Sequence, residues 1–381
     1  MPQKIICITN DFGPRAGGIE TFIMGLIERL PKGAITVYTS SQDQTSQYDE
    51  KWLSEFGVKV IRDKSKILLP TPRVVRAVKK IIKEEKIETA LFGAAAPLAV
   101  MSREIRKAGI SRIVALTHGH EVWWSKVWPF KLAIRFIGNN VDHLTYLGDF
   151  TRSEISRALS KRASQAMVKI APGIDTDHFA PHPGAPELRN SLGLSDKKVI
   201  ISVGRLVHRK GQDTLVAALP RILQSHPTAH ILMVGEGSYR EHLEKLVKKL
   251  KVANSITFIG RIQHADLPRY ICAGDIFAMP SRSRLAGLEV EGLGIVYLEA
   301  SSCELPVVAG ISGGAPDAVV EGVTGLTVDG TNPNDVARAI ISLFDDPQAA
   351  RAMGVAGRKW IYSDWRWQIW AGAFGDLLIK D

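Results

Sequence analysis

The chain has 381 residues, of which 45% are hydrophobic and 23% are charged, a composition typical of a globular protein long enough for two domains. No apolar run reaches the roughly 18 residues of a membrane-spanning helix, and the N-terminal apolar run is too short for a signal peptide. Cys7, Cys272 and Cys303 lie far apart without metal-ligand spacing, so we expect reduced thiols in a cytoplasmic protein.

The positive charge is concentrated in the first half of the chain. Residues 1–170 contain 27 Lys and Arg against 16 Asp and Glu, a net charge of +11, whereas residues 171–381 contain 22 against 23, a net charge of −1. This asymmetry predicts that the first half faces a polyanion. No helix-turn-helix, zinc or RNA-recognition signature accompanies the charge, so we expect an anionic membrane surface and no nucleic acid.

Short apolar runs alternate with longer amphipathic runs along the chain. In the first half we predict an amphipathic helix at 19–30 and strands at 4–9, 34–39, 89–93 and 112–119. A segment rich in Pro and Gly, 170–189, interrupts the pattern. After it, helical runs alternate with predicted strands at 199–204, 230–235, 255–260, 275–280, 306–310 and 325–328.

This alternation is typical of two doubly wound α/β domains, each with a parallel sheet. We expect the first domain at 1–170 and the second at 171–360, with a C-terminal helix at about 361–381 packing back on the first. Ligands are expected in the cleft that the carboxyl ends of the strands face.

Two glycines, Gly17 and Gly18, lie between the first strand and the first helix. Glycines in this place let backbone amides approach a phosphate, and the helix dipole adds partial positive charge. The spacing G-x-G-x-x-G of dinucleotide-binding turns is absent, so a tight turn without a ligand explains the pair equally well.

Two cations, Arg205 and Lys210, follow the predicted strand at 199–204. Arginine offers a rigid fork for phosphate oxygens and lysine a mobile point charge, so together they are suited to neutralising a diphosphate. Solvated loop cations are the alternative unless other motifs face the same cleft.

Two glutamates, Glu291 and Glu299, are separated by a Gly-Leu-Gly turn and the start of a helix. Carboxylates that act as an acid–base pair on one bond lie about 5–9.5 Å apart. Eight helical residues rise about 12 Å, which disfavours such a pair. The spacing favours two acceptors that grip different ends of an elongated ligand, while helix amides after Gly294 meet a phosphate.

A D-x-D sequence, Asp175-Thr176-Asp177, is a metal-binding pattern in some enzymes. It lies in the segment between the domains rather than in a turn after a strand. We therefore expect no metal there.

Two basic, apolar stretches in the first half are candidates for contact with a membrane. Residues 70–86 place valines and isoleucines on one helical stripe beside several Lys and Arg, and residues 121–138 interleave Trp123, Trp124 and Trp128 with cations. Both patterns suit an anionic lipid interface. A solvated surface helix and the wall of an acceptor pocket remain the respective alternatives.

The sequence E-G-L-G-I-V-Y-L-E-A at 291–300 resembles the E-x7-E signature of retaining glycosyltransferase family 4, which has the two-Rossmann GT-B fold. Further matches cover nearly the whole chain and include NDF-x-PR-x-GGI, THGHE at 117–121, PGID-x3-F, GRL-x2-RKGQD and SGGAPD-x-V. HGHEVWWS and RKGQD most resemble the phosphatidylinositol mannoside mannosyltransferases of the B type. Leu285-Ala286 stand where that subgroup is richer in glycine, which leaves the loop shape open.

The resemblance implies a donor-binding second domain with GDP-mannose as donor, and a first domain that binds the acceptor. Arg205 and Lys210 would bind the diphosphate, Glu299 the ribose hydroxyls and Glu291 the sugar hydroxyls, and Arg261 and its neighbour would frame the base. The implied donor contacts are Gly17, Gly18, Arg205, Lys210, Arg261, Ile262, Glu291, Gly294, Ile295, Val296 and Glu299.

The resemblance also implies that His118 lies against the donor sugar, with His120 or a purely structural histidine as alternatives. The residues implied in catalysis are His118, Arg205, Lys210 and Glu291. In a front-face displacement the leaving phosphate takes the acceptor proton, so no general base is assigned. No cofactor or required metal is expected.

The resemblance therefore implies a mannosyltransferase acting on a phosphatidylinositol mannoside-type lipid, peripheral on the inner face of the cell membrane. Alternatives are a family 4 transferase with another nucleotide sugar or acceptor, a sugar-nucleotide epimerase, and a non-catalytic nucleotide-sugar sensor.

Overall fold

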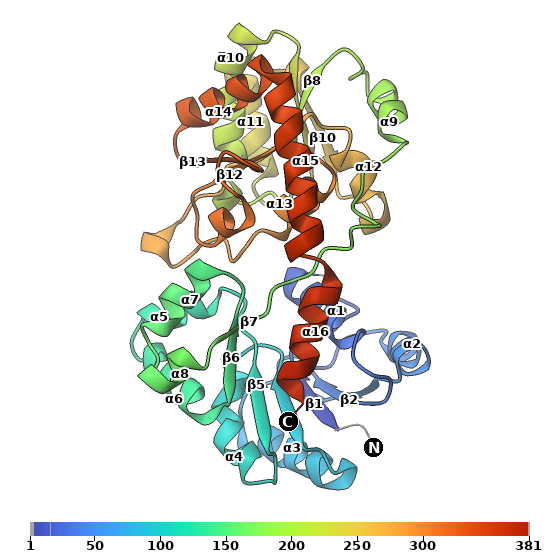
Figure 1. The fold of residues 1–381 in the computed structure, drawn as a ribbon, viewed down its shortest axis with the longest axis vertical. Coiled ribbons are helices and arrows are strands. Elements are labelled where there is room, and N and C mark those ends of the chain that lie inside the picture. Colours follow the sequence, from blue (N-terminus) through green and yellow to red (C-terminus); the bar gives the residue numbers. More distant parts are fainter. Residues whose placement is uncertain (1–3, 16, 380–381) are drawn as a thin grey trace. The chain divides into compact units, whose positions relative to one another are not determined.

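The computed structural model describes residues 4–15 and 17–379. The chain folds into two compact units: unit 1 comprises residues 1–173 and 367–381, and unit 2 comprises residues 174–366. In Figure 1, unit 1 runs from blue to green and includes the red helix α16, and unit 2 runs from light green to red. Residues 380 and 381 of the predicted C-terminal helix lie outside the described residues.

The described part of unit 1 is built on a parallel sheet of seven strands in the order β3-β2-β1-β4-β5-β6-β7. The order reverses between β1 and β4, which is where doubly wound sheets bind ligands, at the carboxyl edge. The strands are β1 (Ile5–Thr9), β2 (Ile35–Thr39), β3 (Lys59–Arg62), β4 (Thr89–Phe92), β5 (Arg112–Ala115), β6 (His143–Tyr146) and β7 (Val168–Lys169).

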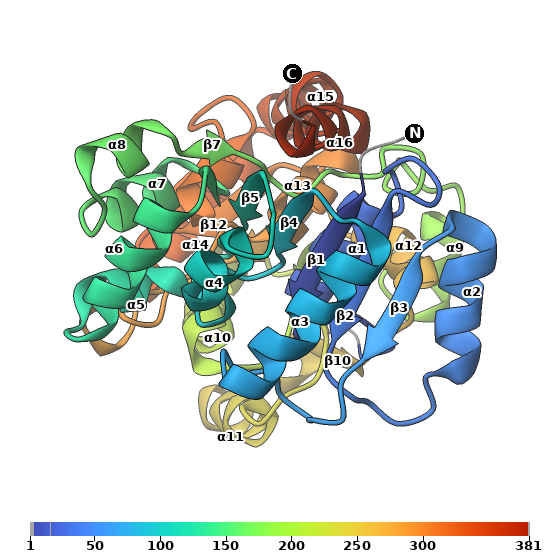
Figure 2. The same cartoon turned by 90° about the horizontal axis from the view of Figure 1, so that it is seen from below.

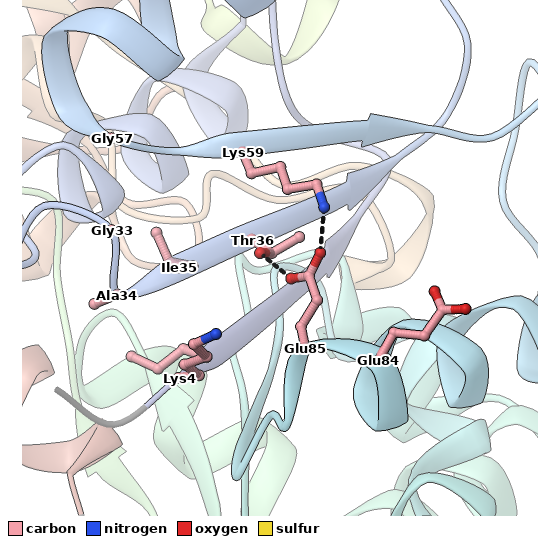
Figure 3. Close-up of a pocket in the computed structure, with 10 residues that line it drawn as sticks. Lys4, Gly33, Ala34, Ile35, Thr36, Gly57, Lys59, Glu84 and Glu85 are labelled. Carbon is pink, nitrogen blue, oxygen red and sulfur yellow. Dashed lines mark hydrogen bonds and ion pairs between the residues drawn. The ribbon is translucent and has the colours of Figure 1, made fainter. Parts of the chain in front are cut away.

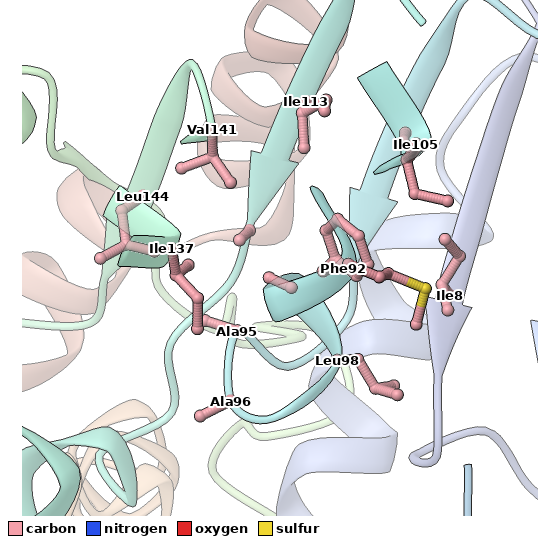
Figure 4. Close-up of a cluster of buried hydrophobic side chains, with 14 of the residues drawn as sticks. Ile8, Phe92, Ala95, Ala96, Leu98, Ile105, Ile113, Ile137, Val141 and Leu144 are labelled. Atoms are coloured by element: carbon pink, nitrogen blue, oxygen red, sulfur yellow. The ribbon is translucent and has the colours of Figure 1, made fainter. Parts of the chain in front are cut away.

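Helices cover both faces of this sheet, and Figure 2 views unit 1 from the side of α3 and α4. One face packs its buried residues, among them Ile8, Phe92 and Ile113, against η1, α4 and α6 (Figure 4). The helices are α1 (Gly18–Ile27), α2 (Ser46–Phe56), α3 (Pro72–Glu85), the 3-10 helix η1 (Leu98–Met101), α4 (Ser102–Arg106), α5 (Glu121–Lys126), α6 (Phe130–Asn140), α7 (Asp149–Ser156), α8 (Lys161–Gln165) and α16 (Trp367–Leu378).

The C-terminal helix differs from its predicted bounds. The chain continues in α15 (Pro347–Asp364), which belongs to unit 2, and only α16 belongs to unit 1. Trp367 starts α16 and requires two glycines, because a Cβ on Gly25 would lie 2.3 Å from its ring and a Cβ on Gly173 would lie 2.4 Å from its Cα. The return to unit 1 therefore begins at Trp367 rather than at about residue 361.

The described part of unit 2 is built on a parallel sheet of six strands in the order β10-β9-β8-β11-β12-β13. Its order reverses between β8 and β11, so unit 2 repeats the doubly wound principle. Two parallel-sheet α/β units confirm the predicted fold class. The strands are β8 (Lys198–Val203), β9 (Ala229–Val234), β10 (Ile256–Gly260), β11 (Ile276–Met279), β12 (Val307–Gly310) and β13 (Gly325–Val328).

The core of unit 2 is continuous from β8 and β9 to the helices α10, α11 and α14. The helices of unit 2 are α9 (Ala185–Ser191), α10 (Gln212–Ser225), α11 (Arg240–Leu250), α12 (Leu267–Ile271), α13 (Ile295–Ser302), α14 (Pro333–Asp345) and α15, with 3-10 turns η2 (His208–Lys210), η3 (Ala253–Ser255), η4 (His264–Asp266), η5 (Leu285–Gly287) and η6 (Ala315–Ala318).

Candidate functional site

In unit 2, the loops that follow β8 and β11 meet at the reversal point of the sheet. Gly211 ends the loop after β8 with a φ of 71°, and a Cβ there would lie 1.8 Å from the Pro280 carbonyl oxygen, directly after β11. Only glycine fits this left-handed position against the neighbouring backbone. The close approach brings residues 205–210 beside the exit of β11.

A compact charged cluster forms at this place. The Lys210 Nζ lies 2.8 Å from the Glu291 Oε2, and the Arg209 Nη1 lies 2.8 Å from the same oxygen. All three side chains are largely buried. One carboxylate oxygen is thus shared by two cations, and the Lys210 ammonium, which has three donors, keeps others available for a further anion.

The ionisation of Glu291 follows from this arrangement. Burial by itself would raise the pKa of the Glu291 carboxyl, but the charges and hydrogen bonds of Lys210 and Arg209 outweigh burial and hold the pKa below its ordinary value. Glu291 is therefore an ionised acceptor at neutral pH.

The start of α13 is anchored by a buried tyrosine. The Tyr297 hydroxyl donates to the Met279 carbonyl oxygen at 2.7 Å and lies 2.8 Å from the Ser281 Oγ, both at the exit of β11. Gly294 precedes the helix with a φ of 82°, and a Cβ there would lie 2.4 Å from the Tyr297 ring. The Gly-Leu-Gly turn is therefore shaped by packing on this ring.

Helix α13 begins directly after the Gly-Leu-Gly turn that follows Glu291. Gly294 caps the helix without a side-chain hydrogen bond, and the first-turn residues Ile295 and Val296 are half-buried. First-turn amides have no intrahelical acceptor and carry the positive end of the helix dipole. The turn is held by Gly314, whose amide donates to the Glu291 carbonyl oxygen at 2.8 Å.

The second glutamate, Glu299, lies on α13 itself and is half-buried. Among the residues that the structure describes, its carboxyl group has no hydrogen-bond or ion-pair partner. Burial raises the pKa of Glu299 to about 7, although the Lys210 charge acts in the opposite direction. A half-buried carboxyl group without donors is suited to accept hydrogen bonds from ligand hydroxyls.

The remaining predicted residues of unit 2 do not join the cluster. Arg205 follows β8 and is exposed. Arg261 is also exposed and Ile262 is half-buried, and both follow β10 at the edge of the sheet, two strands from β8. All three lie on the carboxyl edge, as a ligand extending along that edge would need.

In unit 1, Gly17 and Gly18 begin α1 after β1. A Cβ on Gly17 would lie 2.3 Å from the Glu20 Oε2, whereas a Cβ on Gly18 would meet no atom within 4 Å. Glu20 is buried and pairs with Arg15 at 2.8 Å. Packing against Glu20 thus explains the glycine at position 17, whereas the backbone of Gly18 has open space beside it.

His118 follows β5 and is buried. Its Nε2 donates to the Gly93 carbonyl oxygen, and its backbone amide donates to the Glu121 Oε2 at 2.9 Å. Burial lowers the pKa of His118, although Glu121 acts in the opposite direction, so the ring is neutral. With Nε2 protonated, Nδ1 is left as a hydrogen-bond acceptor.

His120, the alternative to His118, is placed differently. Its Nε2 lies 3.2 Å from the Glu121 Oε1 and its side chain is 36% exposed. Glu121 is fully buried and contacts both histidines, His118 through its backbone amide and His120 through its ring.

Two residues of these clusters were not predicted from the sequence. Arg209 shares Glu291 with Lys210, and its place beside Lys210 in the RKG sequence was the signal that could have found it. Glu121 positions His118, and it stands in the same HGHE stretch. The motifs contain both residues, but only the structure shows the contacts that they make.

Asp175 and Asp177 lie in the linking segment that precedes α9. The Asp175 Oδ1 accepts hydrogen bonds from the backbone amides of Asp177 at 3.1 Å and His178 at 3.0 Å. Across residues 4–15 and 17–379 no three His, Cys, Asp or Glu side chains gather as metal ligands would. Asp175 therefore has a structural use in a turn.

Among the described residues, cavities are found at the amino edges of both sheets, away from these residues. One, of about 330 Å³, is in unit 1, where the Glu85 carboxylate joins Lys59 and Thr36 (Figure 3). The other, of about 390 Å³, is lined by Lys198 and Phe344, among others, in unit 2. Neither contains a residue of the predicted site.

Comparison with known proteins identifies relatives over the whole chain. Residues 16–178 match the family model described as Glycosyltransferase Family 4, and residues 185–360 match that of Glycosyl transferases group 1. The chain is 44% identical over 376 residues to a GDP-mannose-dependent alpha-(1-6)-phosphatidylinositol monomannoside mannosyltransferase of Mycolicibacterium smegmatis, covering 98% of each protein.

A second relative is named for the same donor and for a monoacylated form of the acceptor. The chain is 39% identical over 386 residues to the GDP-mannose-dependent monoacylated alpha-(1-6)-phosphatidylinositol monomannoside mannosyltransferase of Corynebacterium glutamicum, covering 100% of this chain and 98% of the relative. Among solved structures, Anabaena HepE in complex with UDP has a TM-score of 0.82 at 19% identity, with 99% of both chains covered. That likeness establishes the shared fold.

Proposed function

Because the chain belongs to glycosyltransferase family 4, whose members are retaining hexosyltransferases, we propose that it transfers mannose from GDP-mannose to a phosphatidylinositol mannoside-type lipid acceptor. The family excludes the sugar-nucleotide epimerase and the non-catalytic sensor. The observation that carries the proposal is the 39–44% identity over nearly the full length to enzymes named for this donor and this acceptor class.

The charged cluster of unit 2 supports a role in binding the donor. GDP departs with negative charge developing on its diphosphate, so fixed cations stabilise the transition state more than the ground state. We assign this role to Lys210, 2.8 Å from Glu291, and to the exposed Arg205. The first amides of α13 add partial positive charge.

The two glutamates are suited to different ends of the donor. Glu291 is ionised and would accept hydrogen bonds from the sugar hydroxyls while Arg209 stays paired with it. Glu299 has a carboxyl group without donors and would accept from the ribose hydroxyls. Arg261 and Ile262 would contact the base through their main chain.

In unit 1 we assign donor contacts to Gly17 and Gly18 and to His118. The open space beside Gly18 lets a phosphate approach its backbone. The free Nδ1 of the neutral His118 accepts from a sugar hydroxyl. In the reaction, the bond from the anomeric carbon to the phosphate oxygen breaks as the acceptor oxygen bonds to the same face, and the leaving phosphate takes the acceptor proton.

A lipid acceptor implies that the enzyme acts at a membrane surface. In the part of the chain that the structure describes, no helix has the length and apolarity to cross a bilayer. We propose peripheral binding on the inner face, with the basic first half of the chain directed to anionic lipid.

The test is a panel of labelled nucleotide sugars with and without phosphatidylinositol mannoside. Mannose should move from GDP-mannose only when the lipid is present, and NMR of the product should give the α-anomer. Equal or faster transfer from UDP-glucose or UDP-N-acetylglucosamine would contradict the donor, and release of free mannose in place of a lipid product would contradict the acceptor.

A further inference from the structure

Helix α6 packs firmly into unit 1 through one side. Ile134, Ile137 and Gly138 are buried on this side. Figure 4 shows Ile137 among the core residues Ile113 and Leu144. These buried residues form the one apolar side by which a surface helix ordinarily packs on its core.

The outer side of α6 is apolar as well. Trp128, just before the helix, is 78% exposed, and Leu132 and Phe136 are 56% and 37% exposed. Leu132 and Phe136 are spaced by four on α6, so they lie in one row on its surface, and Trp128 precedes the helix by two residues. A surface helix normally turns polar residues to water, so these large exposed apolar side chains indicate a partner.

The surroundings of this row are positively charged. Lys131 and Arg135 alternate with the apolar residues, and both are exposed. From Val122 to Val141 the sequence contains no Asp or Glu. Helix α8, which packs against α6, adds the exposed Lys161 and Arg162. The partner of the row is therefore negatively charged as well as apolar.

The other basic stretch, α3, has no apolar side to offer. Its valine and isoleucine stripe packs into the core, since Val74, Val78, Ile81 and Ile82 are all buried. What α3 presents to water is charge, and Lys80 is within 3.7 Å of Glu84. The structure thus separates two stretches that the sequence left equivalent.

We propose that the set of Trp128, Leu132 and Phe136 with Lys131 and Arg135, here called the α6 stripe, docks on an anionic lipid surface. The apolar side chains enter the boundary of the acyl chains and the two cations meet head groups, and both contributions are known to add in interfacial binding. The inference rests on the proposed function, because a lipid acceptor brings the enzyme to such a surface.

The test is co-sedimentation with vesicles of phosphatidylcholine with and without phosphatidylglycerol. The wild type should bind the anionic vesicles, and Trp128→Ser with Leu132→Ser should lower its partition by about tenfold or more, since two exposed apolar side chains lose their burial in the interface. Lys131→Gln with Arg135→Gln should lower it by roughly tenfold at low salt and less at high salt.

A matched control is available in the same unit. Leu53 on α2 is 57% exposed, close to the 56% of Leu132, so Leu53→Ser matches the leucine substitution and should leave the partition unchanged. Ile67, 67% exposed before α3, gives a second comparison. Wild-type binding by the Trp128/Leu132 variant, or an equal loss in the Ile67→Ser variant, would overturn the assignment to the α6 stripe.

Two further measurements separate this inference from its premise. Transfer to a short-chain, water-soluble acceptor should be unchanged in the Trp128/Leu132 variant, because the stripe contains none of the residues assigned to the donor. A wild type that binds vesicles but transfers no mannose would sink the proposed function alone. Size-exclusion chromatography tests whether the partner of the stripe is a second copy of the chain. If the wild type is a dimer, and the Trp128/Leu132 variant is a monomer that still binds vesicles, lipid is not the partner.

Discussion

The carboxyl edges of the two sheets carry opposite chemistry on the same doubly wound plan. In unit 2 the edge holds a charged cluster, in which Lys210 and Arg209 share the Glu291 carboxylate. In unit 1 the corresponding edge holds a buried, neutral His118 that donates to a backbone carbonyl. Fold topology places a site, but the residues after each strand decide what it does.

The difference indicates that the charged cluster and His118 have different roles in the reaction. Fixed cations are useful where charge develops during the reaction, and a neutral acceptor is useful where hydroxyl groups must be oriented without adding charge. On this account, substitution of a cation in the cluster of unit 2 should affect the chemical step, whereas substitution of His118 should affect the contact with the sugar.

Removing the lysine of the cluster should have the largest effect. In Lys210→Ala the rate of transfer should fall by about 100- to 1000-fold, the usual cost of deleting one group that stabilises transition-state charge. Single-turnover kinetics and far-UV circular dichroism measure the loss and the fold. Lys245→Ala, on the exposed face of α11, is the control. A folded Lys210→Ala enzyme with most of its activity would remove Lys210 from the mechanism.

Removing the arginine of the cluster should have a smaller effect of a different kind. Arg209→Met leaves Glu291 with Lys210 alone, so we expect the transfer rate to fall by about 10- to 100-fold, with the affinity for GDP unchanged within about threefold. Arg209→Lys should restore part of the rate. Isothermal titration with GDP and kinetics with GDP-mannose separate the two effects, and equal losses in both would assign Arg209 to the nucleotide instead.

Substituting the histidine of unit 1 should affect the sugar and not the nucleotide. His118→Phe should lower the rate by about tenfold, the loss of one oriented hydrogen bond, and leave GDP binding unchanged. Because the pKa of His118 lies below its ordinary value, the wild-type rate should not fall between pH 6.5 and pH 8 through this group. A basic limb that disappears in His118→Phe would show that the histidine titrates during turnover.

Glu299 should affect stability in a pH-dependent way. The folded carboxyl group has a pKa of about 7 against an ordinary 4.5, so the folded protein binds more protons than the unfolded protein between these values. Stability therefore falls as the pH rises through this window. Glu299→Gln should be more stable than the wild type at pH 8 by about 1–3 kcal/mol, and should bind GDP more weakly. Urea unfolding at pH 5 and pH 8 measures the first effect; a difference that does not grow with pH would contradict it.

Removing divalent metal should have the smallest effect. Lys210 and Arg205 supply the positive charge on the donor in this account, so an excess of EDTA should change the initial rate by less than about twofold. Loss of activity that Mg²⁺ or Mn²⁺ restores would show that the cations of unit 2 do not act alone.

Most strands were predicted from their apolar runs, whereas β3, β6 and β7 of unit 1 were not. Every residue of β1 and β9 is buried, which gives continuous apolar runs. Strand β3 is only half-buried and includes Lys59 and Arg62, and β7 has two residues, so neither has a readable period. Pairing with β2 and β6, rather than an apolar run of their own, makes β3 and β7 strands.

The candidate site divides in the same way. Glu291, Glu299 and Lys210 were predictable because a motif and its spacing point to them, and the structure brings Lys210 and Glu291 into contact. Arg209 was not predicted although it stands beside Lys210, because its pairing with a carboxylate 82 positions away is formed only on folding. Contacts made by folding leave no local pattern.

The most direct test of the central claim is a crystal structure with GDP-mannose bound. We expect the β-phosphate within about 3 Å of the Lys210 Nζ and the ribose hydroxyls within about 3 Å of the Glu299 carboxylate, the distances of ordinary hydrogen bonds. Arg209 should stay paired with Glu291. A nucleotide bound away from the carboxyl edge of unit 2, for example in the cavity beside Lys198, would contradict the account.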